Sequence, residues 1–446
     1  MNKLISYLLG SSMMCTLMAQ VEPGAGKWKT LVIPSGSAFR LPAPPESVTA
    51  ATELAWEREC VAQRDPAAVA SIHFWDAGSP GYRWMQLAQQ SVVNAGLPTP
   101  LQTRALALVA AAISDATIAA WDSKYAYNRA HPSGLDPAVA PVVAVPRSPS
   151  YPSEHAVTAG AATAVLAYLF PDHATKLADM ANEAALSRVL AGVAFPSDAF
   201  SGLDLGQSIG KAVVTLAQSD GSGQAFTGSY PSAPGVWSSA NPVTPLAGSW
   251  KPWVLTTPQD FRPGPPPAFG SDAANTQYTN VKNLTRTNAI NHLAWFWQPG
   301  FFQTWLQQVD LEVFQNHLDL NAPRAARAYA YETIAQHDAT LACWDAKYTY
   351  LELRPSQADP TIQPLFAIPQ HPGYPSGHAC ASGASGAVMS FLFPNDAALF
   401  TSMANDAGTS TFDAGIHTQL DVSQGLAHGT QVGQKVAARA SADGAN

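Results

Sequence analysis

The sequence has few charged residues, and this shortage excludes several classes of protein. Only 13% of its 446 residues are charged, which is about half the usual share of a globular chain. Basic residues number 24 against 32 acidic ones, so no positive surplus is present to neutralise a nucleic-acid backbone. Disorder is excluded because hydrophobic residues make up 47% of the chain and include 12 tryptophans, which is ample material for a core.

Long apolar runs are also lacking beyond the N-terminus, where none approaches the roughly 18 residues that a membrane helix requires. The sequence therefore predicts no membrane span. Residues 1–19 form a short apolar stretch that contains Lys3 near its start and ends at the small residue Ala19, a pattern typical of a secretory signal peptide. We expect a secreted or periplasmic protein, with a buried N-terminal helix as the alternative.

Cysteine is scarce, with four residues in the whole chain. Cys15 lies within the predicted signal peptide, and the number that remains is odd, so we expect no disulfide framework. A bridge between Cys343 and Cys380 and a set of buried thiols are both compatible with the sequence.

What the chain does contain is an internal repeat with an offset of 223 residues. The correspondence runs from position 115 to position 210 without a gap, so we infer a tandem duplication. The matched residues Asp115 and Asp338 are expected to hold helices together rather than to take part in chemistry. The clearest match pairs Trp121-Asp122-x-Lys124-Tyr125 with Trp344-Asp345-x-Lys347-Tyr348.

Each copy has the apolar periodicity of helices. Leu106, Val109 and Ile113 recur at intervals of three and four residues, which predicts a helix with one apolar face. Four such helices in each copy predict an all-α fold of two tandem four-helix bundles, closely packed at alanine and glycine. Further helices are expected at 156–169, from there towards Gly192, and from near Gly202, and in the second copy at 325–350, 377–392, 395–414 and 424–440.

The segments around the bundles differ from them in composition. Residues 221–285 are rich in proline, glycine, serine and tryptophan, which disfavours helix. We expect Trp237, Trp250 and Trp253 to pack this linker against the bundles. The sequence thus divides into a signal peptide (1–19), an N-terminal extension (20–68), a first bundle (69–220), the linker (221–285) and a second bundle (286–446).

The second copy holds an ordered set of cationic, hydroxyl and imidazole side chains. Lys347 and Arg354 lie seven residues apart and supply positive charge, and an arginine can bind two oxygens at once. Ser376 and Gly377 precede an apolar stretch, which places a hydroxyl and a backbone N–H at a helix N-terminus, where anions are stabilised. The pattern predicts an oxyanion site.

Two histidines complete the predicted site. His378 follows Gly377 directly, and His417 precedes Asp421 by four residues. We expect Asp421 either to orient the His417 imidazole across one helical turn or merely to cap the next helix.

These motifs resemble those of the vanadium-dependent haloperoxidase / type 2 phosphatidic acid phosphatase (PAP2) superfamily. Its pattern is Lys-x6-Arg-Pro, then Pro-Ser-Gly-His, then Ser-Arg-x5-His. The Phe-Arg-Pro-x-Pro-Pro-Pro linker, which begins at Phe261, is similar to that of the soluble bacterial haloperoxidase-like members. The resemblance covers the second copy and the linker well and the first copy more weakly.

The resemblance implies an enzyme that binds vanadate, or one that forms a transient bond to phosphate in the same place. His417 would hold vanadium in a peroxidase and attack phosphorus in a phosphatase, and His378 would be the general acid or base. The implied substrates are hydrogen peroxide, a halide and an organic acceptor, or a phosphate ester. The oxygens of the anion would be bound by Lys347, Arg354, Ser376 and Gly377.

The second copy departs from the family pattern at one position. The pattern places an arginine six residues before the last histidine, where this chain has Thr411. Losing a charged contact of this kind typically costs about 1.5–3 kcal/mol. The candidates for a replacement are Arg262, Arg286 and Arg324, or Arg188 of the first copy acting across the interface.

The first copy lacks other parts of the pattern. It has His131 in place of Arg354, Glu154 in place of Gly377 and Ala194 in place of His417. A carboxylate at the anion position and the missing histidine predict that this copy binds vanadate and phosphate poorly. We interpret it as a structural partner. It keeps Lys124, Ser153, His155 and Ser187-Arg188.

The leading functional prediction is a vanadium-dependent haloperoxidase, favoured by the duplicated bundle, the proline-rich linker and the absence of membrane helices. A secreted acid phosphatase is one alternative, and a non-catalytic oxyanion-binding protein is another because of Thr411. By resemblance His371 hints at bromide or iodide rather than chloride, although a loop histidine without a role fits as well. The sequence specifies neither the organic substrate nor the oligomeric state.

Overall fold

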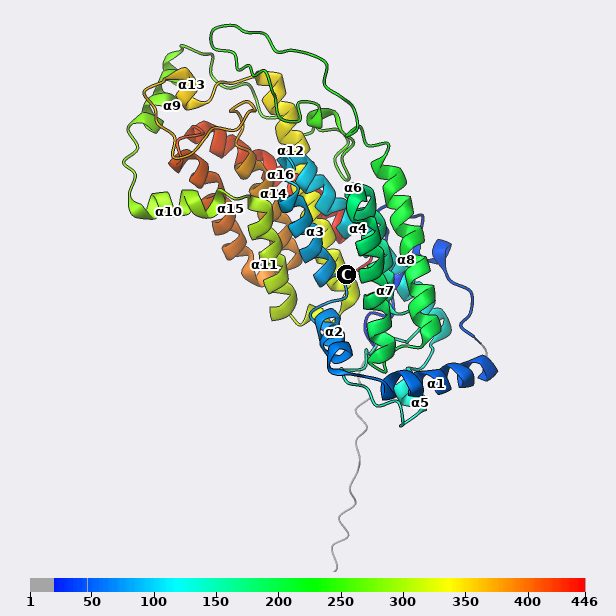
Figure 1. Ribbon diagram of the computed structural model, residues 1–446. Helices are drawn as coiled ribbons and strands as arrows, with labels where there is room; N and C mark the ends of the chain where they lie inside the picture. Colours follow the sequence, from blue (N-terminus) through cyan, green and yellow to red (C-terminus); the bar gives the residue numbers. More distant parts are fainter. Residues whose placement is uncertain (1–19, 46, 446) are drawn as a thin grey trace, which may run out of the picture.

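The long helices give the molecule an elongated shape (Figure 1). The computed structural model describes residues 20–45 and 47–445, and these residues form helices and loops with no strand. The all-α fold expected from the sequence is confirmed. The predicted signal peptide and Cys15 lie outside the described residues.

Four long helices in each copy form the predicted bundles. The last helix of each copy begins earlier than expected, because the carboxylates of Asp198 and Asp421 accept hydrogen bonds from main-chain N–H groups that precede the helix. The first bundle consists of α4 (Thr99–Tyr127), α6 (Glu154–Leu169), α7 (Ala174–Leu190) and α8 (Pro196–Ala217). The second consists of α12 (Ala322–Tyr350), α14 (Gly377–Leu392), α15 (Ala397–Asp413) and α16 (Gln419–Ser441).

Helices α4 and α12 pack against each other at the centre and join the two bundles. They run antiparallel, because Leu101 at the start of α4 packs beside Trp344 near the end of α12, and Trp121 lies in the same pocket wall as Ala322. Their C-terminal ends therefore point to opposite ends of the molecule. Figure 1 shows this in the short helices that follow them, α5 (Pro132–Leu135) and α13 (Pro355–Ala358).

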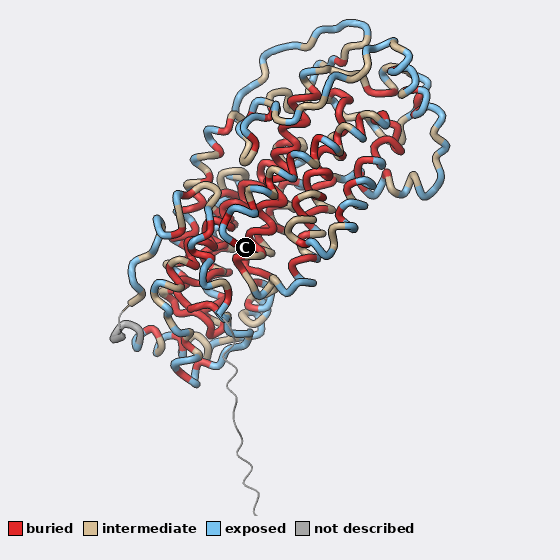
Figure 2. The backbone as a smooth tube through the Cα atoms, turned by 180° about the vertical axis from the view of Figure 1, so that it is seen from behind, coloured by how far each residue is buried: buried red, intermediate tan, exposed pale blue. Residues whose placement is uncertain are grey.

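The buried core runs along the same axis (Figure 2). Helix α4 is apolar and long enough to pass a length and hydropathy test for a membrane span, but most of that stretch is buried inside the protein. The absence of a membrane span therefore stays a prediction.

Glycines allow the last helix of each bundle to approach its neighbour closely. A Cβ on Gly429 of α16 would lie 1.8 Å from the carbonyl oxygen of Cys380 in α14, and one on Gly206 of α8 would lie 2.1 Å from that of Val157 in α6. Only glycine fits such contacts. This close packing fixes the start of α16 against the start of α14, where the candidate site lies.

Further helices extend the repeat beyond the bundles. Helices α2 (Pro66–Asp76) and α3 (Tyr82–Asn94) pack on the first bundle in the way that α10 (Asn288–Trp297) and α11 (Phe301–Gln315) pack on the second. Helix α1 (Ser47–Ala62) has its counterpart in α9 (Asp272–Lys282).

Helix α9 corrects the expectation that the segment 221–285 is free of helix. Ser271 caps it by accepting a hydrogen bond from the N–H of Ala274, and Tyr278 and Val281 are buried along one face. The average composition of a long segment therefore does not reveal a short amphipathic helix within it. The tryptophans of the linker pack against the bundles as expected, since Trp237 and Trp250 are buried and Trp253 is half-buried against the core.

An irregular arm precedes each copy, and each arm is held by one buried aspartate. Asp115 accepts hydrogen bonds from the N–H groups of residues 31–33 at 2.7–3.0 Å, and Asp338 accepts the same set from residues 253–255 at 2.7–3.0 Å. Both aspartates are thus structural, and the arms belong to the repeat.

Each arm also touches the other copy. The N–H of Lys29 donates to the carbonyl oxygen of Asp443 at 2.7 Å, and that of Lys251 donates to the carbonyl oxygen of Asp220 at 2.8 Å. The two copies are therefore related by an approximate twofold arrangement in which each arm spans both bundles.

Candidate active site

Lys347 lies in the last turn of α12, where a cation is favoured by the helix dipole. Its Nζ donates to the carbonyl oxygens of Pro372 and Gly373 at 2.9 Å and of Pro375 at 2.5 Å. The side chain is fully buried, and burial lowers its pKa to about 8, with the charge of Arg354 acting in the same direction. The loop that precedes α14 thus wraps around a buried ammonium group.

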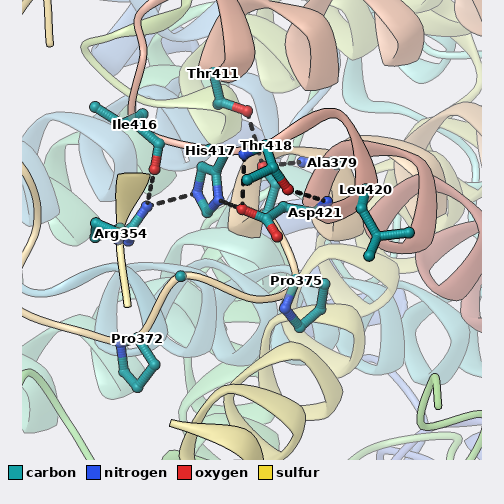
Figure 3. Close-up of polar contacts among 12 residues, drawn as sticks. Arg354, Pro372, Pro375, Ala379, Thr411, Ile416, His417, Thr418, Leu420 and Asp421 are labelled. Atoms are coloured by element: carbon teal, nitrogen blue, oxygen red, sulfur yellow. Dashed lines mark hydrogen bonds and ion pairs between the residues drawn. The ribbon is translucent and has the colours of Figure 1, made fainter. Parts of the chain in front are cut away.

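Arg354 lies just before α13 and is also fully buried. Its Nη1 donates to the carbonyl oxygen of Ile416 at 2.9 Å and to Nε2 of His417 at 2.7 Å (Figure 3). Its Nη2 donates to Nδ1 of His371 at 3.1 Å. Burial lowers the pKa of Arg354 to about 10.

His417 is held on both sides of its ring. Its Nδ1 lies 3.1 Å from Oδ2 of Asp421, and its Nε2 faces Arg354, as Figure 3 shows. Because a guanidinium is only a donor, Nε2 is the acceptor and Nδ1 carries the proton that Asp421 receives. Burial and nearby cations keep the pKa of His417 well below its ordinary value. The neutral ring therefore has its lone pair on Nε2, where it accepts from Arg354. A nucleophile or a ligand requires this lone pair, so binding through it would displace the bond to Arg354.

Asp421 has both of the roles that the sequence left open. Its Oδ2 accepts from Nδ1 of His417 and also from the N–H of Thr418 at 2.9 Å, which caps α16. It therefore fixes the imidazole relative to the helix axis.

Glu352 is a site residue that the sequence analysis missed. Burial raises its pKa well above the ordinary value, and Asp421, with which it forms a side-chain hydrogen bond, raises it further. Glu352 is the donor in this carboxylic acid–carboxylate pair. The repeat held a hint of this pairing. The residue of the first copy that corresponds to Glu352 is Arg129, and it pairs at 2.6 Å with Asp198, which corresponds to Asp421.

Ser376, Gly377 and His378 begin α14 beside this cluster. The Ser376 hydroxyl lies 3.1 Å from that of Thr411, so the threonine that replaces the family arginine contacts the predicted cradle. A Cβ on Gly377 would meet Lys347 at 4.0 Å, which places this backbone position next to the ammonium group.

His378 is turned towards a main-chain acceptor. Its Nε2 lies 3.1 Å from the carbonyl oxygen of Trp297, and its ring packs edge-on against Phe301. Burial lowers its pKa to about 4, and the positive charges of Arg354 and Lys347 act in the same direction. The imidazole is therefore neutral at pH 7 and lies within electrostatic reach of the cradle.

The candidate replacements for the missing arginine are engaged elsewhere. Arg262 pairs with Asp345 and Arg324 with Glu22, whereas Arg286 donates to the carbonyl oxygens of Asp413 and Gln363. Arg188 pairs with Asp76 at 2.6 Å within the first copy. None of these arginines forms a hydrogen bond or ion pair with Ser376, His378 or His417 in the described part of the chain.

The two copies differ sharply in charge balance. In the first copy Lys124 forms an ion pair with Glu154 at 2.7 Å. Burial raises the pKa of Glu154, but Lys124 and His155 outweigh this and hold it at about 2. In the second copy, by contrast, neither Lys347 nor Arg354 has an ion pair among the described residues. Buried positive charge without a carboxylate is the expected signature of an anion site.

The residues of the second copy fit a tetrahedral oxyanion such as vanadate. Two buried cations supply charge, Ser376 and the N–H of Gly377 supply neutral donors at a helix N-terminus, and Nε2 of His417 supplies a lone pair. Among the described residues no group of three His, Cys, Asp or Glu side chains is placed to hold a metal cation. The donor set thus suits an anion.

The cysteines near the site are thiols. Cys343 and Cys380 are buried and free, and the Cys343 thiol lies 3.7 Å from the carbonyl oxygen of Pro375. The bridge that the sequence left open does not form.

Comparison with known proteins supports the family suggested by the motifs. A model of the PAP2 superfamily matches residues 104–221. The solved structure of a bacterial vanadium-dependent iodoperoxidase matches with a TM-score of 0.60 at 20% identity, over 80% of this chain and 95% of that one. A bacterial vanadium-dependent chloroperoxidase matches in its holo form with a TM-score of 0.57 at 15% identity, over 77% and 92% of the two chains. No curated protein matches the chain.

Residues 104–221 match the model of the PAP2 superfamily, which agrees with the resemblance that the sequence motifs suggested. The chain as a whole has the fold of the vanadium-dependent haloperoxidases. The family match falls on the first copy, whereas the fuller set of site residues lies in the second.

Proposed function

We propose that the second copy binds vanadate at His417 and that the protein is a vanadium-dependent haloperoxidase. The observation that carries the proposal is the pair of buried cations, Lys347 and Arg354, without carboxylate partners beside a neutral Nε2 of His417. In such a dry site an anion is bound far more strongly than in water.

The residues then have distinct tasks. His417 holds the anion through Nε2 while Asp421 fixes its ring. Lys347, Arg354 and Ser376 neutralise and orient the oxygens. The neutral His378 accepts or returns a proton at Nδ1, because its Nε2–H donates to the carbonyl oxygen of Trp297. Bound vanadate supplies activation of hydrogen peroxide towards a halide. In the overall reaction, halide is oxidised to hypohalous acid, peroxide is reduced to water, and one proton is consumed.

One residue favours a peroxidase of bromide or iodide, because the family resemblance links a histidine at position 371 to these halides. The fold matches do not separate the halides, since the iodoperoxidase and the chloroperoxidase match this chain almost equally. His371 lies beside the cradle, bonded to Arg354 and packed 4.8 Å from the ring of Trp344. We expect His371 to influence the orientation of the Arg354 guanidinium, which binds the oxygens of the anion.

An acid phosphatase with a phosphohistidine at His417 is the second candidate. The lone pair on Nε2 is the feature that favours it, because this atom is equally placed to attack phosphorus. A non-catalytic oxyanion-binding protein is the third candidate, and Thr411 in place of arginine favours it. Export from the cytoplasm remains a prediction from residues 1–19.

One set of assays separates these candidates. The full chain is incubated with vanadate, and peroxide-dependent bromination of phenol red is compared with hydrolysis of p-nitrophenyl phosphate. We expect bromination that His417→Ala abolishes and that the matched first-copy variant His155→Ala retains. Phosphatase activity alone would support the second candidate, and vanadate binding without either activity would support the third. Equal loss in both variants would contradict a single site in the second copy.

A further inference from the structure

A cavity of about 550 Å³ opens beside the first copy, far from the site described above. Its volume lies in the usual range for pockets that bind small organic molecules. Ala322 in its wall and Lys347 are separated by 25 residues of α12, which amounts to about 38 Å along the helix. The cavity wall includes Trp121, Pro146, Ser148, His155, Asp319 and Leu320.

The repeat relates this cavity to the mouth of the second-copy site. Trp121 corresponds to Trp344, and His155 corresponds to His378. The anion position behind them is closed in the first copy, where Glu154 pairs with Lys124 and the remaining void measures about 10 Å³, room for one water at most. The first copy has therefore kept an entrance chamber while losing the anion cradle.

One carboxylate of the wall lacks a partner. Asp319 forms no hydrogen bond or ion pair among the described residues, and its side chain is half-buried. Its Oδ1 is enclosed by the protein, so Oδ2 is the oxygen that a ligand in the chamber can reach. Nε2 of His155 and Oγ of Ser148 also lack partners, but they are enclosed and a molecule in the chamber cannot reach them.

The charges in the wall select the kind of molecule. Three carboxylates line the chamber, those of Asp76, Glu154 and Asp319, against one arginine, Arg147, which is exposed. Asp76 and Glu154 already have cationic partners in Arg188 and Lys124. Asp319 is half-buried and has no ion pair among the described residues, so apart from the exposed Arg147 the unmatched charge of the wall is negative and favours a cationic donor.

We propose that this chamber is a second binding site, which takes a small aromatic amine. The ammonium group binds the Asp319 carboxylate. The ring packs against Trp121 and Leu320. The proposal is independent of the chemistry at His417, because the two sites lie at different ends of α12.

Calorimetric titration of the full chain with tyramine tests the proposal. Tyramine carries an ammonium group, an aromatic ring and a phenol, and 4-hydroxyphenylacetate is a matched probe with a carboxylate in place of the amine. We expect tyramine to bind at one site per chain and the carboxylate probe to bind at least about tenfold more weakly. Asp319→Asn should weaken tyramine binding about tenfold, which corresponds to one charge-assisted hydrogen bond.

Two further measurements keep the result specific to the chamber. Leu320→Trp changes an exposed residue of the wall, so the protein should fold while the chamber is filled and tyramine is excluded. Saturating tungstate, which occupies the second-copy cradle, should leave the tyramine affinity unchanged. The proposal is overturned if tyramine does not bind, if both probes bind equally, if Asp319→Asn binds as well as the wild type, or if tungstate displaces tyramine.

Discussion

Glu154 lies 2.7 Å from Lys124, at the position where the second copy has Gly377 beside Lys347. One copy therefore places its own carboxylate beside the lysine, and the other has no side chain at that position. In the proposed function, Gly377 is the residue that leaves room for the anion.

Gly377→Glu should close the second site. A Cβ at this position meets only ordinary contacts, at 3.6 Å from Trp344 and 4.0 Å from Lys347, and an acidic residue is favoured in the first turn of a helix. We expect an ion pair with Lys347 and a loss of vanadate affinity of about a hundredfold or more. The isosteric control Gly377→Gln adds the bulk without the charge and should retain most of the wild-type vanadate affinity. Calorimetric titration with vanadate measures both variants, and an unchanged affinity in Gly377→Glu would contradict the assigned position of the anion.

Thr411→Arg should strengthen anion binding. The threonine hydroxyl lies 3.1 Å from that of Ser376, so a guanidinium at this position reaches the edge of the cradle. A new charged hydrogen bond of about 1.5–3 kcal/mol corresponds to a gain in vanadate affinity of about tenfold to a hundredfold. Thr411→Val removes the hydroxyl without adding charge and serves as the control. A thermal unfolding curve establishes that the larger side chain is accommodated. A folded variant with wild-type vanadate affinity would show that the missing arginine at this position does not limit anion binding.

Anion affinity should fall as the pH rises through about 8. Burial lowers the pKa of Lys347 from 10.5 to about 8, so the anion-free protein loses this positive charge above that pH. Binding then requires uptake of a proton, and the affinity should decrease by up to about tenfold for each further pH unit. Tungstate is the suitable probe because its own charge is constant in alkaline solution. Lys347→Arg remains charged and should show a flat profile; a parallel decline in that variant would assign the titration to another group.

Glu352→Gln should flatten the dependence of stability on pH. The pKa of Glu352 is raised well above 4.5 in the folded protein, so the folded state holds a proton that the unfolded state releases. The wild type therefore loses stability as the pH rises above about 4.5, whereas a glutamine keeps the hydrogen bond to Asp421 without titrating. The difference in unfolding temperature between variant and wild type should grow from pH 5 towards pH 8. Parallel curves over that range would show that Glu352 does not carry the proton.

The helices were readable from the sequence because they are long and periodic, and the repeat supplied each of them twice. The sequence did not predict the early starts of α8 and α16, because Asp198 and Asp421 act as caps only once the preceding loops are in place. Residues 21–50 resemble the linker as a second irregular arm, but the sequence did not predict how either arm is held on its bundle. Their order comes from main-chain hydrogen bonds to Asp115 and Asp338, and such bonds leave no pattern in the arms themselves.

The site was predictable only in part. The spacing of Lys347, Arg354 and His417 indicated which groups converge. It did not indicate that Arg354 bonds Nε2 of His417, because that contact depends on the depth at which both side chains are buried. The role of Glu352 could not be predicted, because in the sequence it is only a charged loop residue. Its raised pKa depends on burial and on Asp421, which only the fold brings beside it.

Each arm makes a main-chain hydrogen bond to the other copy, so the two halves depend on each other. Because Lys29 binds Asp443 and Lys251 binds Asp220, removing either half would remove a contact that holds an arm of the other half. The first half therefore has to keep its shape even though its own anion position is closed, and the chamber on this shared scaffold is available for a different ligand.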